Sequence, residues 1–189
     1  MTQSDMTPSA TESKIRRLSI FLGWAITVIA VLLPIFTWGM WLLPDLSGIT
    51  RTAAPADGFG GGDLSWFGLP IRLGAAGLTT IGRAITVYGF VHLRTLVREA
   101  ARGAYFSAQA VIGFRQFALA SLIAAIWSPV EHIVLGVFLS VSNPNVPNAL
   151  NVTLGSGDLE AIGAALLFFL IAFILAEGRK RTEELELIL

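Results

Sequence analysis

The sequence predicts an all-α integral membrane protein, a four-helix bundle whose N-terminus and C-terminus both lie in the cytoplasm. The chain of 189 residues is 54% hydrophobic and only 14% charged, whereas a soluble domain carries about 25% charged residues. Its apolar residues gather in four long runs, and a run of about 20 apolar residues crosses a bilayer as a helix. The segments that flank and separate these runs are alternately rich and poor in basic residues, which predicts the orientation of the chain in the membrane.

The four predicted spans cover residues 18–43, 69–91, 116–141 and 159–176. They belong to one membrane domain, residues 14–189, that follows a polar and disordered cytoplasmic tail, residues 1–13. The second span is the least apolar of the four, and small residues recur in it at spacings of four and three: Ala75, Thr79, Gly82, Thr86 and Gly89. Such a stripe lets another helix approach closely, either within the chain or in a homo-oligomer.

The orientation follows from where the basic residues lie. Three segments hold most of them, namely the N-terminal flank, the middle segment and the C-terminal flank: Lys14, Arg16, Arg17, Arg94, Arg98, Arg102, Arg115, Arg179, Lys180 and Arg181. The two other loops and their helix ends hold only Arg51 and Arg72. The positive-inside rule therefore places both termini and the middle segment in the cytoplasm. Because the formal net charge is zero, we expect no direct contact with nucleic acid.

Arg83 and Glu131 are the charged residues that lie deepest in the predicted spans. Charges inside a bilayer are costly, and they usually face the bundle interior with a partner. One interpretation is a structural pair that locks the second span to the third. The other is a proton or ion path in a small transporter or an ion-conducting oligomer. The structural interpretation is favoured because the chain has no transport motif.

The sequence predicts neither a catalytic residue nor a cofactor or metal ligand. It lacks the Gly-x-Ser-x-Gly and His-Glu-x-x-His motifs, and the glycines at 58–62 are not followed by the lysine of a phosphate-binding loop. His92 and His132 lie at different depths, roughly 20 Å apart along the membrane normal at ~1.5 Å per residue, so one haem iron cannot take both. We therefore expect a protein that is not an enzyme.

The basic middle segment and the charged C-terminal tail are the best candidates for contact with another molecule. Arg94, Arg98 and Arg102 recur every four residues on one face of a helix that continues from the second span. Gly103 permits a turn, and Ser107 is a candidate N-cap for the next helix. The tail brings Glu183, Glu184 and Glu186, which could face these arginines. One interpretation is the orientation signal plus contacts with anionic lipids, and the other is a docking site for a cytoplasmic protein.

Two segments resemble a family of bacterial four-helix membrane proteins, domain of unknown function 2975. The first is Gly103-Ala-Tyr-Phe106-Ser107-Ala-Gln109 followed by Phe114-Arg115, and the second is Ala176-Glu177-Gly178 with Glu183-Glu184-Leu185-Glu186. The chain departs from the family pattern at Gln109, which replaces Asn, at Phe114, which replaces Leu, and in lacking a final Thr-Val.

The resemblance implies a bacterial inner membrane and no established activity. Members of that family are often encoded beside a small helix-turn-helix regulator, so a cytoplasmic DNA-binding protein is the partner that the resemblance implies. The predicted partner-binding surface lies on the cytoplasmic side and consists of Arg94, Arg98, Arg102, Phe106, Ser107, Arg115, Glu177 and Glu184.

Overall fold

The computed structural model describes residues 10–43, 67–104, 107–142 and 156–186. It contains four long helices, α1 (Ala10–Leu42), α3 (Leu69–Ala101), α4 (Ala108–Ser142) and α5 (Ser156–Glu186), which confirms the all-α class. Residues 10–13, which the sequence assigns to the disordered tail, belong to α1, and residues 1–9 lie outside the described residues. Neither proline nor glycine interrupts residues 10–17, so the helix that the apolar run forms continues past the end of that run.

Three of the helices are long and apolar enough to cross a membrane. These stretches are Arg16–Leu42 (27 residues), Ala108–Ser142 (35 residues) and Ser156–Arg181 (26 residues). Within the described residues α3 is not among them, because Arg72 and Arg83 interrupt its apolar part and basic residues follow from Arg94 on. The helices thus have the length and composition of a membrane protein that crosses the bilayer more than once, and the predicted second span is a helix of lower hydrophobicity.

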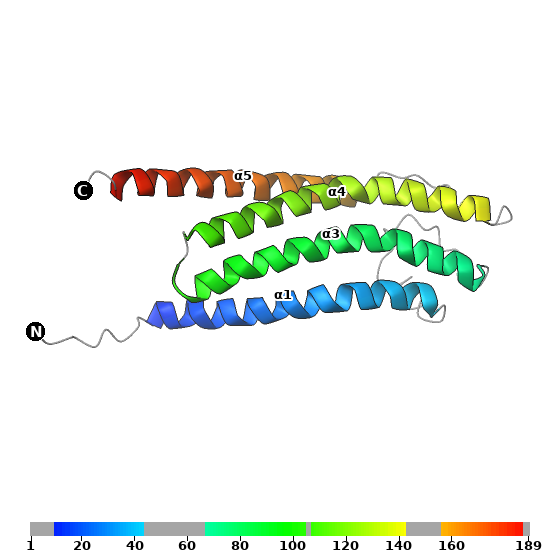
Figure 1. Cartoon of the computed structure of the whole chain (residues 1–189), viewed down its shortest axis with the longest axis horizontal. Coiled ribbons are helices and arrows are strands. Elements are labelled where there is room, and N and C mark those ends of the chain that lie inside the picture. The colour runs from blue at the N-terminus through cyan, green and yellow to red at the C-terminus, as the bar shows by residue number, and fades with distance from the viewer. Residues whose placement is uncertain (1–9, 44–66, 105–106, 143–155, 187–189) are drawn as a thin grey trace, which may run out of the picture.

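The helices lie side by side in the order in which the chain forms them (Figure 1). α3 packs between α1 and α4, α5 packs on α4, and contact between helices that are not neighbours in this row is sparse in the described part. The beginning of α1, the α3–α4 connection and the end of α5 gather at one end of the molecule. We call this the charged end, and its described residues are 14–17, 94–104, 107–115 and 177–186.

α3 and α4 approach each other closely because glycines face the opposite helix. A Cβ at Gly89 would meet the Ala120 methyl at 3.1 Å, and a Cβ at Gly113 would meet the His92 carbonyl oxygen at 2.9 Å. The stripe of small residues in α3 is buried or half-buried, and its glycines face α4. The glycines of the stripe therefore serve packing within the chain, which is one of the two roles that the sequence predicts.

A hydrophobic cluster joins the end of α1, the start of α3 and the end of α4, and these helix ends lie opposite the charged end of the molecule (Figure 1). Its buried members are Trp41, Phe67, Ala75, Ala76, Leu135 and Leu139. The start of α3 is fixed beside this cluster, because the Arg72 Nε donates a 2.7 Å hydrogen bond to the Phe67 carbonyl oxygen. Pro70 stands in the first turn of α3, where its missing N–H costs nothing.

α5 is shifted along the row toward the charged end. At its first turn the Asp158 carboxylate accepts a 3.0 Å hydrogen bond from the Ser128 hydroxyl, which lies midway along α4. The other end of α5 extends past the α3–α4 connection (Figure 1). Ala165 and Ala172 are the buried residues of this helix, and their seven-residue spacing places them on one stripe. Most of its large apolar side chains are exposed, as on a helix that faces lipid.

Candidate functional site

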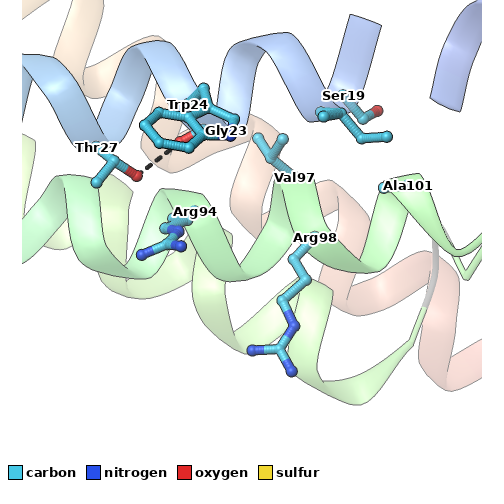
Figure 2. Close-up of a pocket in the computed structure, with 9 residues that line it drawn as sticks. Ser19, Gly23, Trp24, Thr27, Arg94, Val97, Arg98 and Ala101 are labelled. Carbon is cyan, nitrogen blue, oxygen red and sulfur yellow. Dashed lines mark hydrogen bonds between the residues drawn. The ribbon is translucent and has the colours of Figure 1, made fainter. Parts of the chain in front are cut away.

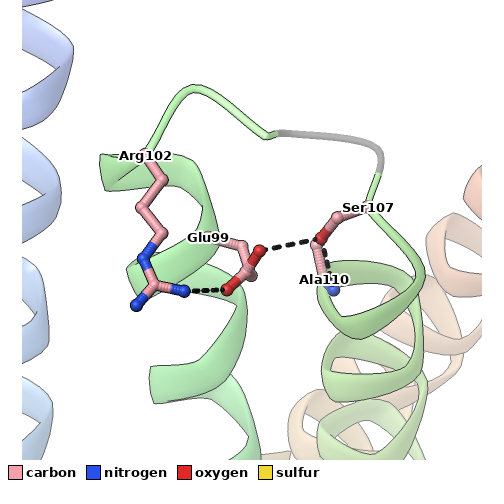
Figure 3. Close-up of polar contacts among 4 residues, drawn as sticks. All are labelled: Glu99, Arg102, Ser107 and Ala110. Carbon is pink, nitrogen blue, oxygen red and sulfur yellow. Dashed lines mark hydrogen bonds and ion pairs between the residues drawn. The ribbon is translucent and has the colours of Figure 1, made fainter.

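The α3–α4 connection is organised around the carboxylate of Glu99, which is only 8% exposed. Its Oε1 accepts a 2.9 Å hydrogen bond from the Arg102 guanidinium, and its Oε2 accepts a 3.2 Å hydrogen bond from the Ser107 hydroxyl (Figure 3). Gly103 has a φ of 79°, a left-handed conformation that glycine adopts without strain. Glu99 therefore holds the end of α3 to the start of α4.

Ser107 caps α4 as the sequence predicts. Its Oγ accepts a 3.1 Å hydrogen bond from the backbone N–H of Ala110, which is the N3 position that an N-cap serine satisfies. The importance of Glu99 was missed at the sequence level, because the carboxylate stood out there only as the single acid among many basic residues. Phe106, which the sequence assigned to the same surface, lies outside the described residues.

Arg94 and Arg98 lie on consecutive turns of α3 and line a groove between α3 and α1 (Figure 2). The groove has a volume of about 220 Å³ and is partly open to the surroundings. Its walls come from both helices and comprise Ser19, Ile20, Gly23, Trp24, Thr27, Arg94, Val97, Arg98 and Ala101. The contribution of α1 was missed at the sequence level, because no local pattern tells which turn of α1 lies beside which turn of α3.

The remaining residues of the predicted partner-binding surface are distributed over α4 and α5. Arg115 is exposed on the early turns of α4. Glu177 is paired within its own helix, since its Oε1 lies 3.7 Å from Arg181 Nε and both side chains are largely exposed. The Glu184 side chain lies outside the described residues. α4 separates α5 from α3 in the row (Figure 1), so the end of α5 is not next to the groove.

Glu131 is buried in the contact between α3 and α4, with 8% of its surface exposed. Its Oε2 accepts a 2.9 Å hydrogen bond from the Trp127 indole N–H one turn earlier. The same carboxylate lies so close to Gly82 that a Cβ at that position would overlap it. Tight packing against a glycine is typical of a side chain that joins two helices.

Arg83 follows Gly82 directly and is exposed. No direct ion pair joins the Arg83 side chain to Glu131, although the preceding residue, Gly82, lies against that carboxylate. The structure therefore brings the predicted pair to the same level of the molecule without contact. Asp158 and Ser128 form their hydrogen bond about one helical turn from Glu131, so polar groups of α3, α4 and α5 share a layer near the middle of the row.

Histidine and acidic residues form no cluster suited to a metal ion within the described ranges. The His92 ring is held by its own helix. Its Nδ1 lies 2.9 Å from the Tyr88 carbonyl oxygen, and the centroids of the His92 and Tyr88 rings are 4.3 Å apart. Comparison of the chain with protein-family models, with curated proteins and with solved structures gave no match in any of the three.

Proposed function

We propose that the chain is a non-enzymatic protein of a bacterial inner membrane that crosses the bilayer four times and has both termini in the cytoplasm. The fourth crossing is α3, and its position between α1 and α4 supports this. Trp38 of α1 donates a 3.1 Å hydrogen bond to Thr80, and Gly23 of α1 lies against Val97. Because α3 accompanies α1 over this length, the two helices occupy the same depth of the bilayer.

We further propose that the charged end binds a cytoplasmic protein through the α3–α4 connection and the end of α5. The observation that carries this proposal is the extension of α5 past that connection (Figure 1). From Asp158 to Glu186 the helix rises roughly 42 Å, while α4 rises roughly 30 Å from Ala108 to Ser128. The extension carries exposed Lys180 and Arg181 and offers a partner a charged helix beyond the packed part of the molecule.

The partner that we propose is a small helix-turn-helix regulator held at the membrane. This choice rests on the resemblance of residues 103–115 and 176–186 to the bacterial family named above. A DNA-binding regulator exposes basic residues to DNA and needs a separate surface for the membrane protein. The mixed charges of the α5 extension suit such a surface, because polar rims of interfaces set orientation and partner choice.

The experiment is affinity purification of the full chain from the organism that encodes it, in a mild detergent, with mass spectrometry of the proteins that co-elute. A small DNA-binding protein should accompany the parent chain. The double variant Arg115→Gln and Lys180→Gln should retain about five- to tenfold less of it, since exposed charge pairs contribute up to about 1 kcal/mol each.

The matched control is Arg16→Gln with Arg17→Gln, which removes two charges from the charged end on α1 and should keep the partner. A parent chain that elutes without a DNA-binding protein contradicts the proposal. An equal loss in the control also contradicts it, because the effect would then reflect total charge and not the connection and α5.

A second candidate, a small transporter or ion-conducting oligomer, is favoured by the polar layer around Glu131, Arg83 and Asp158. In this case Glu131→Gln should abolish proton flux into proteoliposomes that contain a pH-sensitive dye. The amide oxygen can still accept the Trp127 hydrogen bond, so circular dichroism should be unchanged. Glu160→Gln, an exposed position at the start of α5, is the control. Equal flux in the parent and in Glu131→Gln removes this candidate.

A further inference from the structure

The groove between α1 and α3 carries positive charge without a counter-charge. Arg94 and Arg98 line it, and no acidic residue does. Neither arginine has an ion pair within the described part of the chain, whereas Arg102 is bound to Glu99 and Arg181 lies beside Glu177. Two unpaired guanidinium groups on one helix face attract an anion, and the planar guanidinium matches a phosphate with paired hydrogen bonds.

Polar and aromatic groups of α1 complete the lining. The Ser19 hydroxyl makes no hydrogen bond within the described residues and is available as a donor. The Thr27 hydroxyl is already committed, since it donates a 2.8 Å hydrogen bond to the Gly23 carbonyl oxygen. Trp24 of α1 and Arg94 of α3 both line the groove (Figure 2), and indole rings prefer the level of the lipid headgroups.

The rim of the groove is apolar and faces outward. Trp24 is 70% exposed and Ile20 is 52% exposed, and both belong to the stretch of α1 that is long and apolar enough to cross a membrane. Farther from the charged end, Val28 and Val91 are 44% and 56% exposed. A ligand in the groove therefore has exposed apolar side chains on one side of Arg94 and Arg98, and the rest of the charged end on the other side.

We propose that this groove binds the phosphate headgroup of an anionic glycerophospholipid, with Arg94 and Arg98 on the phosphate and the acyl chains along the exposed apolar surface of α1 and α3. The volume of about 220 Å³ is below the roughly 300–1,000 Å³ of pockets for drug-sized ligands, which suits a headgroup with its chains outside. The site depends on α1 lying in a membrane and is independent of any protein partner.

The experiment is native mass spectrometry of the purified full chain in a neutral maltoside detergent, titrated with dioctanoyl phosphatidylglycerol or dioctanoyl phosphatidylcholine. The parent chain should bind the anionic lipid at least about tenfold more tightly than the zwitterionic one. The double variant Arg94→Gln and Arg98→Gln should lose this preference, because each basic residue near an anionic headgroup contributes roughly fivefold in affinity. The variant Arg16→Gln with Arg17→Gln should retain it.

A second variant tests the shape of the groove with every charge in place. Ala101→Phe puts a ring into the lining and should weaken binding of dioctanoyl phosphatidylglycerol about as much as the double variant, which gives a result even if the arginine variants fold poorly. Glycerol 3-phosphate at equal concentration should not compete, because it lacks the acyl chains. Equal binding of the two lipids, an equal loss in the Arg16 and Arg17 control, or competition by glycerol 3-phosphate overturns the proposal.

Discussion

Gly82 explains how a carboxylate is accommodated inside a helix contact. Without a side chain at this position, α3 leaves space for the Glu131 carboxylate and for the Trp127 indole that donates to it. The hydrogen bond compensates part of the cost of removing the carboxylate from water. One glycine thus allows a charged residue of α4 to lie against α3, and the adjacent Arg83 adds an opposite charge at the same level.

The substitution Gly82→Ala should lower stability, because the new Cβ would lie 2.9 Å from Trp127 Cδ1 and would overlap the Glu131 carboxylate. Overpacking of this kind costs about 1–3 kcal/mol. Gly77→Ala is the matched control in the same helix, since a Cβ there would have no heavy atom within 4 Å other than its chain neighbours and the backbone of its own helix. Thermal unfolding in detergent, followed by circular dichroism, should show a lower Tm only for Gly82→Ala. Equal Tm values for the two variants would show that Glu131 and Trp127 move aside freely.

The helices themselves could be predicted from the sequence, because the features that define them are local. The apolar runs became α1, α4 and α5, with each helix longer than its run because charged residues also favour helix. The N-cap at Ser107 and the turn at Gly103 were predicted correctly for the same reason, since a cap and a left-handed glycine depend on residues a few positions apart.

The contacts between helices could not be predicted, because hydropathy does not determine how one helix is placed along another. The groove that joins Trp24 to Arg94 depends on this placement, as does the hydrogen bond between Asp158 and Ser128 that places α5 on α4. Glu99 was missed for a related reason. Its role depends on Arg102 and Ser107 folding back onto it, and a single acid in a basic segment gives no signal of that.

The orientation of the chain in the membrane can be tested by labelling single cysteines at the two ends of α4. The chain contains no cysteine, so a single introduced cysteine is the only thiol. Val141 near the end of α4 is 77% exposed, and Gln109 at its beginning is also exposed. In spheroplasts of a bacterial host, a membrane-impermeant maleimide should label Val141→Cys directly and Gln109→Cys only after the membrane is opened. The reverse pattern would contradict cytoplasmic termini, and labelling of both in intact spheroplasts would contradict a crossing by α4.

The two outer helices of the row, α1 and α5, have apolar parts of unequal length. The apolar part of α1, Leu18–Leu42, rises roughly 37 Å, and that of α5, Leu159–Ala176, rises roughly 27 Å. A bilayer core of roughly 30 Å is too thin for one edge and too thick for the other, and each ångström of mismatch has a small cost. With α1 and α5 both crossing a bilayer, we expect the lipid to be thicker beside α1 and thinner beside α5, or the row of helices to tilt within its own plane. The expected consequence is a difference in membrane thickness between the two edges of the row.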